Sequence, residues 1–207
     1  MLTAVTLLVL ALYFTPLLGV RSVRVEGNRS LGEQEVLAAA EVPLGESMLR
    51  VDADGIRSRL RENPEVASAR AELSWPSTVR IEIEERTPAA FVRDGGAVRL
   101  VDVGGVPFNT VPQPPPGLPE LQASSPDDPL VRAEMSVLAS LPPDLRGQVV
   151  AVTARTPGDL QLRLTEDRGV KWGSLRDSER KATVLPLLLT QPGSVYNVTS
   201  PELPTVA

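Results

Sequence analysis

The sequence predicts an α+β protein with an N-terminal transmembrane helix, a small module ordered strand–helix–helix–strand–strand, and a second mixed α+β sheet domain. Three observations lead to this prediction. Residues 1–20 carry no charged side chain, residues 21–90 switch between strand and helix periodicity, and residues 91–207 hold further alternating segments around two helical ones. We therefore expect an anchor over residues 1–20 and folded domains over residues 21–90 and 91–207.

The composition is that of a folded protein and argues against several functional classes. Hydrophobic residues make up 42% of the 207 residues and charged residues 23%, which is ordinary globular usage. A net charge of −5 argues against nucleic-acid binding, which needs a basic surface to neutralise phosphates. Because cysteine and histidine are absent, disulfides, zinc or haem sites of the usual kinds and histidine-based triads are not expected. We expect no metal and no cofactor.

The first twenty residues predict a membrane anchor. An uncharged helix of this length rises about 30 Å, which matches the hydrocarbon core of a bilayer. A cleaved signal peptide is one alternative, but no basic residue precedes the run and the segment Leu17–Val20 is a poor cleavage site. A buried core helix is the other, but such a helix is usually shorter or has a polar face.

The orientation of this anchor conflicts with its flanking charges. Arg21 and Arg24 follow the apolar run, and nothing basic precedes it. The positive-inside rule alone would place the body of the protein in the cytoplasm. A basic cytoplasmic tail missing from the start of the sequence would reverse that orientation, and we expect the body to lie outside the cytoplasm.

The module begins with a strand and a helix. Residues 21–27 alternate, with Val23 and Val25 on the buried face of a strand. Ser30 and Glu33 then fit a capping box, in which each side chain bonds the backbone of the other residue at the start of a helix.

A second helix and two strands complete the module. Asp52 is the predicted N-cap of this helix, and Ile56 and Leu60 lie four residues apart on its inner face. Strands follow over residues 66–73 and 78–85, joined by a Trp-Pro-Ser turn. From Ala67 onward, the hydrophobic residues of both strands occupy odd-numbered positions and are expected to face the core.

These segments together resemble a POTRA domain of the FtsQ/DivIB cell-division family. The matching pieces are VRSVRVEGNRSL, PLGESMLRVD and NPEVASARAELSWPSTVRIEIEERTPAAF, which end on the family's E-R-x-P exit at Glu85–Pro88. The likeness continues beyond them. Leu100–Phe108 is similar to the segment that opens the family's second, β domain. Gly169–Gly173 with Lys181 resembles its strand–glycine–helix element, and Val195–Thr199 resembles its penultimate strand.

The sequence departs from the family pattern at two positions. Asn197 stands where an aspartate is common. Pro186 falls inside the expected last helix and should kink it.

The second domain can also be interpreted from its residues alone. Prolines over residues 111–119 predict a stiff link. The expected elements that follow are a helix from the Asp128–Pro129 cap to Leu141, strands over 149–154, 160–165 and 170–172, a helix over 175–190, and terminal strands over 194–199 and 203–207.

No set of residues nominates a catalytic site. Ser124, Ser125 and Ser174 have no histidine base, and no Ser-x-x-Lys motif occurs. Asp52 and Asp54 lack the rest of a calcium loop. Glu82, Glu84 and Glu85 form an acidic cluster near the end of the third strand of the module. Glu82 and Glu84 share one face, as paired carboxylates would, but a solvated face is the simpler interpretation. We expect no enzyme activity and no small-molecule substrate.

Two groups remain as candidates for protein contacts. Arg176, Arg180 and Lys181 form a basic helix face, either solvated or in contact with an acidic partner or a membrane surface. Trp172 and Tyr196 are candidate interface anchors, because aromatic residues are favoured there, although Trp172 fits core packing equally well.

The resemblance implies a single-pass scaffold of the division machinery, held in the cell membrane at the division septum. It implies binding to the small coiled-coil proteins FtsB and FtsL and, through them, to the septal peptidoglycan synthase complex. Physically, a partner segment would add as a strand to an exposed sheet edge, which we place within residues 195–206. The expected partner-binding residues are Trp172, Tyr196, Val198, Thr199, Thr205 and Val206.

Three alternatives stay open. A POTRA module of an outer-membrane assembly machine would need repeated modules or a β-barrel. A secreted or membrane-anchored POTRA-containing binding module not involved in division would, if secreted, be cleaved near residue 20. An exported enzyme would need convergent catalytic groups.

Overall fold

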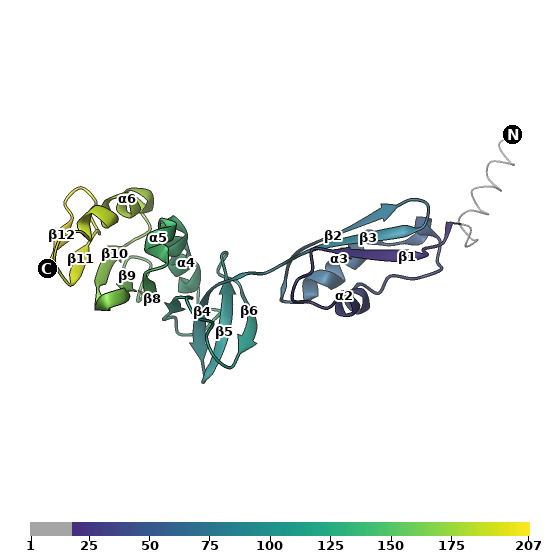
Figure 1. Ribbon diagram of the computed structural model, residues 1–207, viewed down its shortest axis with the longest axis horizontal. Coiled ribbons are helices and arrows are strands. Elements are labelled where there is room, and N and C mark those ends of the chain that lie inside the picture. Colours follow the sequence, from purple (N-terminus) through teal and green to yellow (C-terminus); the bar gives the residue numbers. More distant parts are fainter. Residues whose placement is uncertain (1–17) are drawn as a thin grey trace. The chain divides into compact units, whose positions relative to one another are not determined.

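The computed structural model describes residues 18–207 (Figure 1). The chain forms two compact units, which divide between Arg86 and Thr87. Residues 1–17 of the predicted transmembrane helix lie outside the described residues. Within residues 18–207, no helix combines the length and the apolar character needed to cross a bilayer.

The first unit is a three-stranded sheet with two helices, in the strand order β1-β3-β2. β1 pairs in parallel with β3, and β2 pairs antiparallel with β3. The elements are β1 (Ser22–Glu26), α2 (Glu33–Ala40), the 3₁₀ turn η2 (Met48–Arg50), α3 (Ala53–Glu62), β2 (Val66–Ser74) and β3 (Thr78–Glu85). The predicted order strand–helix–helix–strand–strand is confirmed.

The core of this unit forms where the periodicity predicts it. Ile56 and Leu60 of α3 are both 1% exposed and pack with Val79 and Ile81 of β3 in one hydrophobic cluster. The N-cap is also as predicted, because the side chain of Asp52 accepts a hydrogen bond from the Gly55 amide at 2.9 Å.

A β-bulge changes which residues of β2 face this core. The pairing register with β3 shifts between Val66 and Ser68. As a result Val66 and Ala69 are buried while Ala67 is exposed. The prediction that Ala67 faces the core was wrong, because the extra residue of a bulge reverses the strand alternation.

The capping box predicted at Ser30 and Glu33 does not form, and a different carboxylate takes its place. α2 begins at Glu33 without a side-chain cap. The Ser30 hydroxyl instead donates to Glu85 at the end of β3, at 2.7 Å. The same carboxylate accepts hydrogen bonds from the backbone amides of Arg29, Ser30 and Leu31 at 2.6 to 3.0 Å. We call this contact the Glu85 nest.

The Glu85 nest favours the charged form of its carboxylate. Desolvation raises the pKa of Glu85, but the amides of residues 29–31 and the Ser30 hydroxyl outweigh it and lower the pKa from 4.5 to about 2. The nest therefore stabilises the fold above the ordinary pKa of glutamate, and this contribution is lost as the pH falls towards 2.

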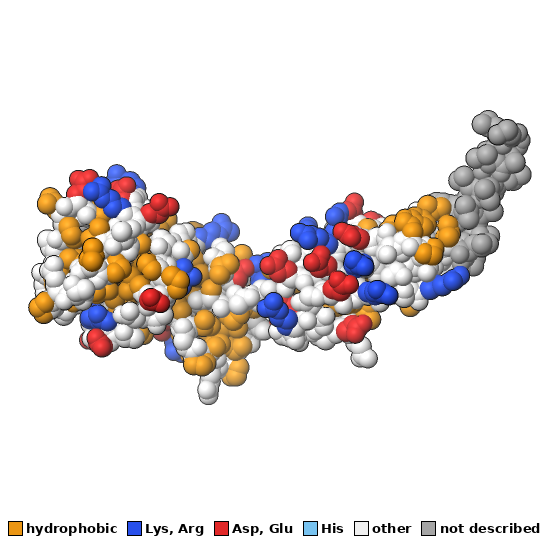
Figure 2. Space-filling model, turned by 45° about the horizontal axis from the view of Figure 1, so that its top comes forward, with side chains coloured by type: hydrophobic (Ala, Val, Ile, Leu, Met, Phe, Trp, Pro, Cys, Tyr) orange, Lys and Arg blue, Asp and Glu red, His pale blue; other side chains and the backbone are white. Residues whose placement is uncertain are grey.

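The other two carboxylates of the predicted acidic cluster lie on a solvated face. Glu82 pairs with Arg70 at 3.5 Å, and Glu84 accepts a hydrogen bond from the Ser68 hydroxyl at 3.1 Å. Both side chains are exposed, and acidic and basic side chains alternate on the face of this unit drawn in Figure 2. The solvated interpretation holds for these two glutamates and is wrong for Glu85.

The second unit is built on a nine-stranded sheet in the order β12-β11-β10-β9-β8-β7-β4-β5-β6. The pairs β4–β7, β7–β8 and β10–β11 are parallel and the others antiparallel. The strands are β4 (Pro88–Asp94), β5 (Ala97–Asp102), β6 (Pro107–Val111), β7 (Glu120–Leu121), β8 (Val149–Ala154), β9 (Leu160–Leu164), β10 (Gly169–Gly173), β11 (Val195–Asn197) and β12 (Thr205–Val206).

Three helices pack on this sheet and gather on one side of it in Figure 1. They are α4 (Leu130–Ser140), α5 (Pro143–Arg146) and α6 (Ser178–Leu188), and a short 3₁₀ turn, η3 (Thr165–Asp167), links β9 to β10. Val137, Leu185 and Trp172 lie at the centre of the main core, each 0% exposed. Pro186 lies inside α6, which runs two residues beyond it.

The strands β4, β5 and β6 were not predicted from residue periodicity, and β4 shows why. Ala90, Phe91 and Val92 are buried in succession. Ala90 and Val92 belong to the main core, whereas Phe91 joins a second cluster with Leu100 and Phe108. A strand covered on both faces loses its period of two, so the pattern gave no signal.

We predict that Glu85→Gln lowers the unfolding free energy of the first unit by about 1–3 kcal/mol at pH 7, because a neutral amide accepts the backbone amides less strongly than a carboxylate. The difference from the parent protein should shrink as the pH falls towards 2. Urea unfolding followed by Trp75 emission, in a Trp172→Phe background, measures it. Glu82→Gln, on the same strand, is the matched control with an expected change below about 0.5 kcal/mol. Equal effects of the two variants would refute a special role for the nest.

Candidate partner-binding edge

The C-terminal edge of the second sheet is formed by β12, which pairs on one side with β11. Among the predicted partner-binding residues, the side chains of Trp172, Tyr196 and Val198 are buried in the main core. Thr199 and Thr205 are exposed, and Val206 is half-buried. The structure thus gathers all six at this end of the sheet but leaves only the last three with accessible side-chain surface.

The backbone of Val206 faces away from the sheet. Ala207 exchanges two hydrogen bonds with Val195, at 2.9 and 3.0 Å. Val206 lies opposite Tyr196 in the same antiparallel pair, one position along the ladder. Because hydrogen-bonded and non-hydrogen-bonded positions alternate in such a ladder, the N–H and C=O of Val206 point outward from the edge.

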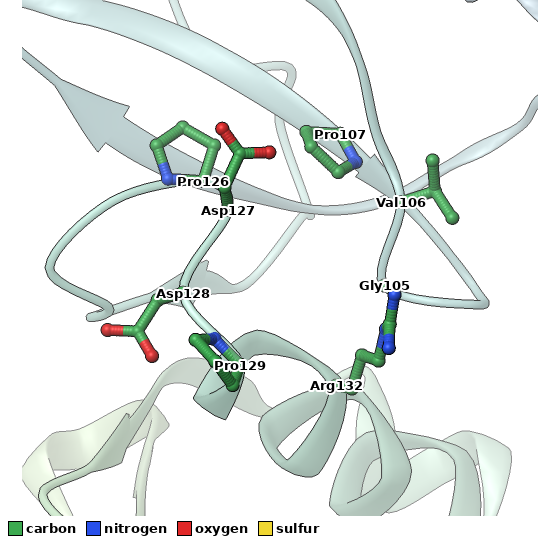
Figure 3. Close-up of a pocket in the computed structure, with 8 residues that line it drawn as sticks. All are labelled: Gly105, Val106, Pro107, Pro126, Asp127, Asp128, Pro129 and Arg132. Carbon is green, nitrogen blue, oxygen red and sulfur yellow. The ribbon is translucent and has the colours of Figure 1, made fainter.

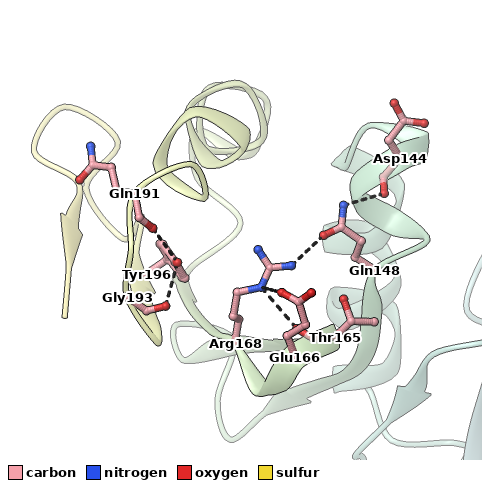
Figure 4. Close-up of polar contacts among 8 residues, drawn as sticks. All are labelled: Asp144, Gln148, Thr165, Glu166, Arg168, Gln191, Gly193 and Tyr196. Atoms are coloured by element: carbon pink, nitrogen blue, oxygen red, sulfur yellow. Dashed lines mark hydrogen bonds and ion pairs between the residues drawn. The ribbon is translucent and has the colours of Figure 1, made fainter.

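A tight turn before β11 holds this edge in place. The Tyr196 hydroxyl lies 3.0 Å from the carbonyl oxygen of Gln191 and 2.8 Å from that of Gly193 (Figure 4). A Cβ atom on Gly193 would come within 2.2 Å of Cγ1 of Val206. The side chain of Val206 therefore packs directly over the Gly193 backbone, and the buried tyrosine fixes the turn that makes this possible.

The loop that follows β11 is ordered by Asn197. Its side-chain oxygen accepts hydrogen bonds from the Thr199 amide at 3.0 Å and the Thr199 hydroxyl at 2.7 Å. Such a side-chain turn is available to asparagine as well as to aspartate, so this departure from the family pattern keeps the local geometry.

The predicted basic helix face is wrong in one member. Lys181 is 1% exposed, its Nζ donates to the Ser174 carbonyl at 2.8 Å, and it lies 5.8 Å from the centre of the Trp172 ring. Desolvation lowers the pKa of Lys181. Arg176 and Arg180 remain exposed. Lys181 lies four residues before Leu185, so the two side chains share one face of α6. This spacing was the signal that the lysine lies on the inner face of the helix.

An interaction around Arg168 fastens the turn between β9 and β10. Its guanidinium donates to the Gln148 side chain at 3.1 Å and lies 3.5 Å from the carboxylate of Glu166 (Figure 4). Glu166 has a left-handed backbone, with φ of 61°. The contact stabilises a turn with a strained backbone.

A surface pocket of about 440 Å³ lies between the Gly105–Pro107 turn and the start of α4 (Figure 3). Its lining includes Asp128 and Arg132. Asp128 accepts a hydrogen bond from the Leu130 amide at 2.9 Å, so its carboxylate is bound to the first amide of α4. Within the described residues, no three acidic side chains converge as metal ligands.

Glu134 is a buried carboxyl group that the sequence interpretation missed. It is 0% exposed, and neither carboxyl oxygen has a hydrogen-bond partner among the described residues. Desolvation raises the pKa of Glu134 to about 8, while the nearby Ala154 amide, which is not placed well enough for a hydrogen bond, opposes the rise and the charge of Asp128 adds to it. The signal was its spacing from Val131 and Leu138, which places it on the apolar stripe of α4.

Two family models match the chain in succession. The model described as POTRA domain, FtsQ-type matches residues 18–86. The model described as Cell division protein FtsQ/DivIB, C-terminal matches residues 90–200.

Curated relatives with the name Cell division protein FtsQ are similar over most of the chain. The protein of Mycobacteroides abscessus is 41% identical over 197 residues, covering 94% of this chain and 63% of that protein. That of Mycolicibacterium smegmatis is 41% identical over 199 residues, covering 95% and 60%. That of Streptomyces griseus is 33% identical over 202 residues, covering 92% and 97%. The chain thus spans 63% and 60% of the length of the first two relatives and 97% of the third.

A solved structure is also similar. The major extracytoplasmic domain of DivIB from Geobacillus stearothermophilus, as its trans isomer, superposes with a TM-score of 0.40 and 17% identity. The match covers 50% of this chain and 91% of that one. A likeness at this level carries no argument about function.

We predict that Gly193→Ala destabilises the second unit by about 1–3 kcal/mol, because the new methyl group overlaps the Val206 side chain and displaces β12. Urea unfolding followed by Trp172 emission, in a Trp75→Phe background, measures the change. Gly158→Ala is the matched control, since its Cβ would meet nothing closer than 4.0 Å. A Gly193→Ala protein as stable as the control would contradict the packing of Val206 on this turn.

Proposed function

The chain belongs to the FtsQ/DivIB family of cell-division proteins, and we propose that it acts as a single-pass scaffold that binds other division proteins outside the cytoplasm. The observation that carries the proposal is the edge of β12, where the N–H and C=O of Val206 point away from the sheet. In this proposal the chain binds other proteins and does not catalyse a reaction. A secreted or membrane-anchored POTRA-containing binding module that is not involved in division is the less favoured hypothesis, because the relatives described above are named Cell division protein FtsQ.

Anchorage is part of the proposal. Residues 1–20 contain no charged side chain and are long enough to cross a bilayer as a helix. The chain would leave the membrane just before the first unit, with both units in the extracytoplasmic space at the division septum.

Binding would occur by strand addition at β12. A partner segment that pairs with Val206 gains two main-chain hydrogen bonds, and its alternate side chains reach the two faces of the sheet. Pro201 and Pro204 limit how far towards the N-terminus the paired stretch extends, because proline has no N–H to offer. Thr199 and Thr205 are exposed on this side and are available for side-chain contact.

The partners that fit this mode are the small coiled-coil division proteins FtsB and FtsL and, through them, the septal peptidoglycan synthase complex. An extended segment that flanks a coiled coil can pair with an edge while the coil stays intact. The buried residues Trp172, Tyr196 and Val198 act in this proposal by holding the edge, and not by touching the partner.

We predict that Val206→Pro weakens binding of the FtsB-type partner about tenfold or more. The substitution removes the outward N–H and leaves a partner carbonyl unpaired, which costs about 1–3 kcal/mol. Because this N–H does not bond to β11, the fold should survive, as proline is tolerated on edge strands. Calorimetric titration of the partner's extracytoplasmic segment measures the affinity.

The control for this variant is Val206→Ala, which shortens the same side chain and keeps the N–H. It should bind more tightly than the proline variant. Equal binding of all three proteins would place the partner elsewhere on the molecule.

We also predict that a fluorescent fusion of the complete gene product gathers as a band at mid-cell in dividing cells, with its C-terminal body accessible to external protease once the outer layers are removed. Uniform membrane fluorescence would contradict recruitment to the septum. A protected body would contradict the proposed orientation.

A further inference from the structure

Within residues 18–86, the first unit exposes three large hydrophobic side chains. Leu44 is 67% exposed, Leu49 47% and Trp75 52%. Single exposed hydrophobic residues are common on proteins, but a group of them marks an interaction surface.

The three side chains lie at the same end of the unit, on either side of residues 19–21. On one side, Val20 exchanges backbone hydrogen bonds with the loop after α2, donating to Glu46 at 2.8 Å and accepting from Gly45 at 2.9 Å. On the other side, the Arg21 amide donates to the Ser77 carbonyl in the β2–β3 turn at 2.8 Å. Hydrophobic side chains gather at this end of the unit in Figure 2.

The backbone presents these side chains from ordered positions. Leu44 precedes Gly45, whose backbone is left-handed and hydrogen-bonded to Val20. Leu49 follows Met48, which is 0% exposed and fixes η2 to the core. Their exposure therefore belongs to the folded unit and is not a property of a loose loop.

Two basic side chains without an ion pair lie at this end. Arg21 and Arg50 are exposed, and neither forms an ion pair with another residue of the described chain. Glu46 is the exposed carboxylate of the same loop. Hydrophobic side chains beside unpaired arginines match the boundary of an anionic bilayer, where apolar groups insert and guanidinium groups meet phosphates.

The chain enters the first unit at this end. Residues 1–17 carry no charged side chain and join the described chain at Leu18, next to the same surface. Tryptophan is enriched at membrane interfaces because its ring is apolar and its N–H is polar.

We propose that this end of the first unit rests on an anionic lipid bilayer, with Leu44, Leu49 and Trp75 in the headgroup region and Arg21 and Arg50 beside lipid phosphates. The inference rests on the proposed anchorage of residues 1–20. It adds a second attachment point, which fixes the tilt of the unit on the membrane.

The test uses the two tryptophans of the chain as separate reporters. The full chain is reconstituted in vesicles of phosphatidylcholine and phosphatidylglycerol that contain brominated lipid, which quenches nearby tryptophan emission. In a Trp172→Phe background, the emission of Trp75 should fall strongly. In a Trp75→Phe background, the buried Trp172 should be unaffected and serves as the internal control. If Trp172→Phe fails to fold, the difference between parent and Trp75→Phe emission gives the same quantity.

Leu44→Asp with Leu49→Asp should reduce the quenching of Trp75 while the protein still floats with the vesicles. Leu187→Asp, a leucine 72% exposed on the second unit, is the matched control and should leave quenching unchanged. Replacing phosphatidylglycerol by neutral lipid should also reduce quenching, and equal quenching would overturn the role of the arginines.

Two failures are distinguishable. A protein that floats while Trp75 stays unquenched overturns this inference and leaves the proposed anchorage intact. A protein that does not float overturns both.

Discussion

The second unit depends on one constraint: every backbone N–H and C=O group in a sheet needs a hydrogen-bond partner. At β12 this need is met on one side only, so Val206 carries an N–H and a C=O without a neighbouring strand. Two features around the edge hold it in place. The Tyr196 hydroxyl fixes the preceding turn, and Gly193 leaves room for the Val206 side chain. The aromatic residue nearest the edge thus acts beneath it and not on its surface.

Much of the fold could be predicted from the sequence where one face of a helix or strand is buried and the other is exposed to solvent. β3 has the predicted bounds, and α3 has its predicted cap and inner face. The hydrophobic periodicity did not predict the structure where an element lacks one buried and one exposed face or where its alternation is interrupted. β4 is covered on both faces and has no alternation, and the bulge in β2 turns Ala67 outward. The family resemblance was enough to predict the position of the candidate edge. The outward direction of the Val206 N–H and C=O could be derived only from the pairing register of β11 and β12.

Long-range contacts were the second source of failure. Ser30 carries the signature of a local capping box, yet its hydroxyl bonds to Glu85, 55 residues further along the chain. The buried ionisable groups of the second unit belong to the same class. Glu134 and Lys181 sit where spacing places apolar residues, and desolvation disfavours the charged form of each. For Glu134, whose pKa is raised to about 8, the stability present below the ordinary glutamate pKa is lost as the pH rises through 8.

The parallel pairing of β1 with β3 has a mechanical consequence. The chain enters the first unit at the start of β1 and leaves it at the end of β3, and these strands are neighbours in the sheet. Tension applied at these two ends of the unit would pull the two strands in opposite directions along their length. All the hydrogen bonds of the pair then share the load, whereas a hairpin pulled at its open end would lose them one at a time. The Glu85 nest lies at the exit point and adds its hydrogen bonds to that shared load, so the pairing that builds the sheet also opposes extension of the unit by its two ends.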